Sequence, residues 1–142
     1  MDLIVESFSG LNWLGVILAT LSTFVVGYVW YDVRVFGNTW LKLVGLTKEE
    51  SEDTEGMGKV YGLTALQSFL AAILLGCLII ATDTTGIVDS VLFAAIVGLV
   101  LRAGTHIMHN GFAKRDVKLT LIDGGHDVVS LAVMGLILSL FR

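Results

Sequence analysis

Six ionisable side chains lie inside otherwise apolar stretches of the chain, and their types could carry chemistry. They are Arg102, His106, His109, Asp123, His126 and Asp127. The first three are spaced at i, i+4 and i+7, which places them within about 60° of one helical face at 100° per residue. The last three cover about 100° of a second helix by the same arithmetic. The spacing therefore predicts a polar cluster between two helices.

An antiparallel hairpin between the two stretches would bring these residues to matching depths. Arg102 then lies level with His126 and one step from Asp127, while His106 lies level with Asp123. An unpaired charge at membrane depth costs at least about 2.5 kcal/mol. We therefore expect Arg102 to form an ion pair with Asp123 or Asp127.

Two interpretations of this cluster remain open. In the first, it is a hydrogen-bonded clamp that holds two helices together. In the second, His106, Asp123 and His126 form one site that opens toward the cytoplasm and takes up a proton or, less readily, a divalent metal. Histidine titrates near neutral pH, and imidazole with carboxylate suits transition metals, but the charge of Arg102 opposes a bound cation. We rank the clamp first, proton uptake second and metal third, and expect neither a cofactor nor a bound metal.

The elements that position this cluster follow from composition. The chain has 142 residues, of which 55% are hydrophobic and 15% charged, too apolar for a soluble domain of this size. Its net charge of −4 excludes a basic nucleic-acid binder. Each of four apolar stretches approaches the roughly 20 residues that cross a bilayer. They are residues 11–31, 60–81, 87–109 and 119–141. This pattern predicts an all-α polytopic membrane protein, a single domain over residues 1–142 with four transmembrane helices in one bundle.

The polar segment 32–59 is expected to lie in the cytoplasm, with a short interfacial helix around Trp40 and a capping box between Thr47 and Glu50. Seven basic residues support this orientation: Arg34, Lys42, Lys48, Lys59, Lys114, Arg115 and Lys118. The opposite side has Arg142 alone, so the positive-inside rule places both termini outside. We expect four aromatic residues to anchor the chain at the two interfaces: Trp13, Trp30, Tyr31 and Trp40.

Small residues recur every four positions along the first apolar stretch: Gly15, Ala19, Thr23 and Gly27. Such a stripe lets another helix approach closely. It could serve packing inside one subunit or an interface between subunits, and the sequence leaves both open.

The motifs of known catalysts fail on inspection. The segment 56–59 ends in Gly-Lys but lacks the earlier glycine and the following Ser or Thr of a phosphate loop. His106 and His109 lack the intervening glutamate of a zinc-protease helix. We therefore expect no enzyme.

Several short blocks, taken in order, give the chain a resemblance to a known family. They are Asn12-Trp13-Leu14, Gly27-Tyr28-Val29-Trp30-Tyr31, Met57-Gly58-Lys59-Val60-Tyr61, Leu121-Ile122-Asp123-Gly124-Gly125-His126 and Met134-Gly135. The whole resembles the bacterial domain of unknown function seventeen-sixty-one. That resemblance implies a small four-helix protein of the bacterial inner membrane with no assigned activity. His126 matches a polar residue of the family pattern, whereas Asp127 is an additional acid.

These observations favour a non-enzymatic membrane protein with a structural or accessory role. We expect it to be embedded in the lipid bilayer and to associate with copies of itself or with a larger membrane complex. The alternative is a small ion or proton channel or transporter that uses the cluster Arg102, His106, Asp123, His126 and Asp127 as its path. A polar lumen lined by Arg102 and Asp127 would distinguish the second class from the first.

Overall fold

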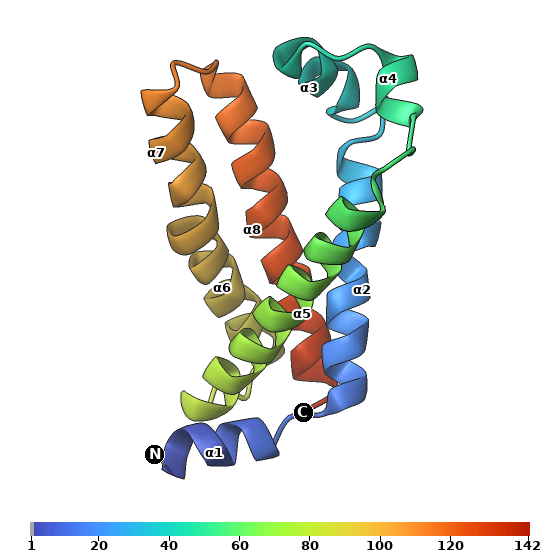
Figure 1. Cartoon of the computed structure of the whole chain (residues 1–142). Coiled ribbons are helices and arrows are strands. Elements are labelled where there is room, and N and C mark those ends of the chain that lie inside the picture. The colour runs from blue at the N-terminus through green and yellow to red at the C-terminus, as the bar shows by residue number, and fades with distance from the viewer. Residues whose placement is uncertain (1) are drawn as a thin grey trace.

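A computed structural model describes residues 2–142, and this part of the chain folds into helices without any β-strand (Figure 1). Four helical segments are long and apolar enough to cross a membrane. They are α2 (Trp13–Trp30), α5 (Gly58–Ala81), the continuous run Ile87–Phe112, and α8 (Val117–Leu140). The predicted all-α membrane fold with four spanning helices is confirmed.

The third spanning segment contains a turn that the sequence did not predict. It consists of α6 (Ile87–Val97), the π-helical turn η1 (Gly98–Ala103) and α7 (Gly104–Phe112). At Gly98 a Cβ atom would lie 3.1 Å from the Cα of Val128 and 3.2 Å from the backbone oxygen of Asp127. The backbones of η1 and α8 therefore run close together, and such π-turns are frequent at functional sites.

Helix α8 is the central element, packed against α6 and η1 on one side and α2 on the other. Glycine makes both contacts close. A Cβ at Gly135 would lie 2.7 Å from the backbone oxygen of Ser90, and one at Gly15 would lie 2.7 Å from the Cβ of Phe141. Within the α2 stripe Gly15, Ala19 and Thr23 are buried, and Gly27 faces His126. In this chain the stripe packs inside the subunit.

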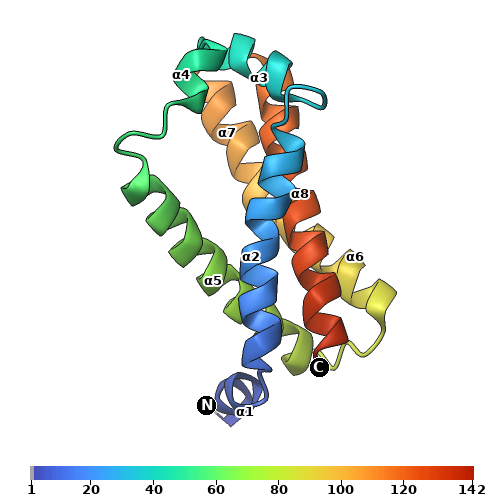
Figure 2. The same ribbon diagram turned by 90° about the vertical axis from the view of Figure 1, so that its right-hand side faces the viewer.

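Helix α5 packs on the bundle through its second half. Its buried residues are Ser68, Ala72, Leu75, Gly76 and Ile79. Its first half leans away from α7 and α8, as two views at right angles show (Figures 1 and 2). The bundle is therefore tight at one end and splayed at the other.

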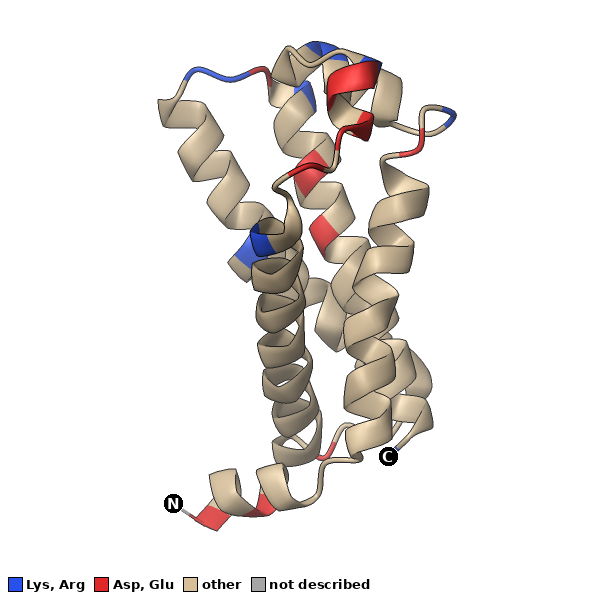
Figure 3. Cartoon of the chain, turned by 45° about the vertical axis from the view of Figure 1, so that its right-hand side comes forward, with Lys and Arg blue, Asp and Glu red and all other residues tan. Residues whose placement is uncertain are grey.

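The splayed end carries seven of the nine Lys and Arg residues together with as many Asp and Glu residues (Figure 3). It is called here the positive end for its Lys and Arg alone, which are the residues that the positive-inside rule counts. The connection from α2 to α5 lies there and forms two short helices, α3 (Gly37–Val44) and α4 (Lys48–Glu52). Helix α3 coincides with the short helix predicted around Trp40, and it ends at Gly45, whose φ of 78° is left-handed. The predicted capping box between Thr47 and Glu50 begins α4. Those hydrogen bonds lower the pKa of the Glu50 carboxyl below its usual range.

The opposite end is crossed by α1 (Asp2–Ser9), a helix that the sequence did not predict (Figure 1). It packs against α5, and Phe8 makes an edge-to-face contact with Trp13 at 5.4 Å between ring centroids. Leu3, Ile4 and Val5 stay exposed. An eight-residue helix is too short to span a membrane. It is therefore not predicted by a criterion that requires an apolar stretch of membrane-spanning length.

Candidate functional site

The carboxylate of Asp127, on α8, is the centre of the candidate site. The residue is only 5% exposed. Its Oδ1 lies 3.1 Å from Nη2 of Arg102 and 3.4 Å from Nδ1 of His126, and its Oδ2 lies 3.0 Å from Nε2 of His106. One carboxylate therefore joins three basic side chains from η1, α7 and α8. Charge-assisted contacts of this kind are the strong ones among hydrogen bonds.

Close packing of the two helices makes these contacts possible. A Cβ at Gly124 would lie 3.1 Å from the Cβ of Ala103, so the backbones approach just beside the ion pair. Arg102 uses Nη2 for Asp127, while its Nη1 is buried and has no hydrogen-bond partner within residues 2–142. Of the two terminal nitrogens of the guanidinium, only Nη2 therefore contacts a protein acceptor.

His126 lies between α8 and α2. Its Nε2 lies 3.3 Å from the hydroxyl of Ser130, and its ring is 5.2 Å from that of Tyr31. A Cβ at Gly27 would approach Nε2 to 3.5 Å. A cavity of about 510 Å³ between α2 and α5 reaches His126 and Thr23, and the Thr23 hydroxyl is buried without a partner in the described part of the chain. The imidazole thus lies in the wall of a cavity.

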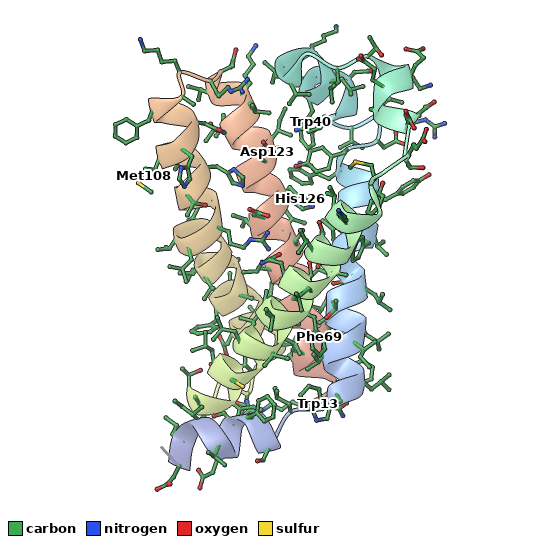
Figure 4. All side chains as sticks on the ribbon, in the orientation of Figure 1. Trp13, Trp40, Phe69, Met108, Asp123 and His126 are labelled. Atoms are coloured by element: carbon green, nitrogen blue, oxygen red, sulfur yellow. The ribbon has the colours of Figure 1, made fainter. Side chains whose placement is uncertain are left out.

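Asp123 forms a second polar contact one turn nearer the positive end, in the region where Figure 4 labels it beside Trp40 and His126. Its Oδ1 accepts hydrogen bonds from the Tyr31 hydroxyl at 2.9 Å and from Nε1 of Trp40 at 3.0 Å. The Tyr31 phenol is therefore the donor in this contact.

The expectation that Asp123 shares a site with His106 is therefore wrong. On α8, Asp123 points between the directions of His126 and Asp127. At its level α2 and α3 supply two neutral donors, and the carboxylate binds those instead. Trp30 adds a third contact nearby, since its Nε1 donates to the backbone oxygen of Ile122 at 3.0 Å.

His109 also lies outside the cluster, because its side chain is exposed. The face of α7 that meets α8 is set by His106 and by Asn110, which donates to the Thr120 hydroxyl at 3.1 Å. His109 lies about 100° around the helix from Asn110. A predicted helical face about 60° wide contains both His106, which contacts α8, and His109, which does not. The helical spacing alone therefore cannot distinguish the two.

The aromatic contacts to α8 were missed at the level of the sequence, although a signal was present. The sequence pattern predicts Trp30, Tyr31 and Trp40 as interface anchors only. Buried Trp N–H and Tyr O–H groups need acceptors, and Asp123 is the carboxylate at their depth. Within residues 2–142 no group of three or more His, Cys, Asp or Glu side chains is arranged to hold a metal ion. The contacts that the structure shows at Asp127 are an ion pair with Arg102 and close polar contacts with His106 and His126.

The fold and this charged cluster together define a small polytopic helical membrane protein. A family model described as a protein of unknown function (DUF1761) matches residues 14–139. The chain therefore belongs to this family, and the resemblance predicted from its short blocks is confirmed. No curated protein matches the chain, and no solved structure matches it.

Proposed function

We propose that this protein is a non-enzymatic membrane protein with a structural or accessory role, in which Asp127 clamps the helices of the bundle. The observation that carries the proposal is the engagement of this one buried carboxylate with Arg102, His106 and His126 at 3.0–3.4 Å. Charged groups at membrane depth are stable only when they are paired. Here they pair with one another across two helices.

Asp123 extends the clamp from η1 and α7 to α2 and α3. Its hydrogen bonds from Tyr31 and Trp40 tie α8 to the end of α2 and to α3. Asp123 thus connects α8 with elements far away in the chain, whereas Asp127 connects α8 with its chain neighbours η1 and α7. A clamp of this kind stabilises a bundle whose α5 leans away at the same end.

The cellular location in this proposal is the bacterial cytoplasmic membrane, with the positive end inside. Seven basic residues flank the spans at that end against Arg142 at the other, which favours this orientation under the positive-inside rule. Trp30, Tyr31 and Trp40 then lie at the inner interface and Trp13 at the outer one. Both termini face outward.

The accessory role implies association with copies of this chain or with other membrane proteins. The α2 stripe is used inside the subunit, so association would use another surface. Single-molecule photobleaching of the labelled full chain in native-lipid nanodiscs, with co-purified proteins analysed from the same membranes, tests this. More than one bleaching step, or a stoichiometric partner, supports the proposal. A monomer without a partner contradicts it.

A second candidate function, proton uptake within a channel or transporter, is favoured by one specific feature. Two histidines contact the same carboxylate, and one of them lies in the wall of a cavity. The test is the number of protons taken up when purified protein in nanodiscs is shifted from pH 8 to pH 6, with tightly bound metal assayed on the same samples. Uptake that is lost in His126→Ala supports this candidate. Unchanged uptake in the variant contradicts it.

A further inference from the structure

A second cavity, of about 560 Å³, lies between α5 and the helices α6, η1 and α8. Its walls are apolar except at Gln67 and Arg102. Along α5 it extends from Leu63 to Leu78, a distance of about 22 Å at 1.5 Å per residue. This cavity, called here the α5 groove, therefore runs along the spanning helix and not across it.

Arg102 and Gln67 form the polar end of the α5 groove. Gln67 is exposed on α5, and the Arg102 side chain is 27% exposed although its Nη2 pairs with Asp127. A guanidinium binds phosphate well. An occupant with an anionic oxygen at this end would therefore meet a cationic and an amide side chain in an otherwise apolar wall.

The depth of Arg102 suits a lipid headgroup. Tyr31 and Trp40 mark the level of Asp123 on α8, and aromatic side chains of this kind lie at the headgroup level of a bilayer. Asp127, the partner of Arg102, is four residues further along α8, or about 6 Å deeper. The guanidinium is therefore about one helical turn below the headgroups, and a phosphate can reach it while its acyl chain continues toward Leu78.

We propose that the α5 groove binds an anionic phospholipid of the surrounding bilayer, with its phosphate at Arg102 and Gln67 and one acyl chain along the apolar wall. The polar end of the groove favours this occupant over a helix from a second copy, because a guanidinium and an amide at membrane depth match a phosphate and not an apolar helix face.

Native mass spectrometry of the purified full chain tests the proposal, with phosphatidylglycerol and a diacylglycerol of identical acyl chains added in equal amounts. The diacylglycerol lacks the phosphate, so we expect phosphatidylglycerol to be retained about tenfold more, the effect of one added charge-assisted hydrogen bond. Leu74→Trp fills the groove and should abolish retention. The matched control is Leu21→Trp on α2, because Leu21 is 54% exposed and Leu74 57%, and Leu21 lies outside the groove. This control should retain the lipid.

The headgroup contact has its own variant, Arg102→Leu combined with Asp127→Leu, which removes both charges together. It should retain both lipids equally. Equal retention of the two lipids by the wild-type chain, or full retention by Leu74→Trp, would overturn the proposal. So would a dimer in the wild type that Leu74→Trp dissociates, since a second copy would then fill the groove. Bound lipid is read by mass and the clamp by unfolding, so the two proposals can fail separately.

Discussion

Replacing Arg102 by leucine is expected to destabilise the bundle strongly, because it leaves the Asp127 carboxylate buried without its full countercharge. Asp127 is 5% exposed, so water cannot replace the guanidinium 3.1 Å away. Removing one partner of a buried ion pair typically costs about 3–5 kcal/mol. The contacts of His106 and His126 remain at 3.0 and 3.4 Å, but neutral imidazoles supply hydrogen bonds only.

Removing both charges should recover most of this loss. In Arg102→Leu combined with Asp127→Leu no buried charge is left, and a buried pair replaced by apolar residues is often neutral. The histidines lose one acceptor, which adds about 1 kcal/mol. We therefore expect a coupling of about 2 kcal/mol or more between the two sites.

Reversible unfolding in mixed micelles, followed by tryptophan fluorescence, measures these free energies. Arg142→Leu is the matched control, since Arg142 pairs with Asp83 at 2.9 Å but Asp83 is 87% exposed in its side chain. An exposed pair contributes at most about 1 kcal/mol. If the single variant Arg102→Leu lost no more than the double variant, the two charges would not hold the helices together and the reasoning would be refuted.

Three further predictions address packing, topology and the helix α4. Gly135→Ala should cost about 1–3 kcal/mol in the same unfolding assay, because its Cβ would lie 2.7 Å from a backbone oxygen of α6; Gly62→Ala, with nothing within 4 Å, should cost nothing. Cysteines introduced as Ser51→Cys and Thr84→Cys should be labelled from opposite sides of intact cells by an impermeant reagent, and outside labelling of Ser51→Cys would contradict the orientation. The pKa of Glu50 is lowered by the capping box, so its contribution to α4 is present at neutral pH and lost as the pH falls through the lowered value; the protection of α4 amides from hydrogen exchange, relative to the intrinsic rate at each pH, should fall there while the spanning helices stay protected, and unchanged protection would count against it.

The spanning helices could be predicted from the sequence because length and apolar content alone determine them. The predicted stretches 11–31 and 60–81 differ from α2 and α5 by two residues or fewer at each end. Helix α1 could not be found in this way, since its eight residues cannot span a bilayer. The π-turn at Gly98–Ala103 could not be found either, because it depends on how closely η1 packs against α8.

The candidate site was predictable in depth but not in direction. Counting residues from the turn of the predicted hairpin places Arg102 within one residue of the depth of Asp127. Their side chains lie 3.1 Å apart in the structure. Depth follows from counting residues, since each adds a fixed rise. Direction depends on which neighbours offer partners. Asp123 binds Tyr31 and Trp40, which lie 92 and 83 residues away in the chain and come close only in the fold. Contacts between residues so far apart leave no local pattern in the sequence.

The central claim is that the charges at membrane depth hold the helices together and do not carry protons across. Proton flux into liposomes under an imposed pH gradient tests it most directly, with wild-type chain compared with Asp127→Asn and with protein-free liposomes. The account predicts that flux with the wild type equals that of protein-free liposomes and is unchanged by the substitution. Wild-type flux above the protein-free level that Asp127→Asn abolishes would contradict it.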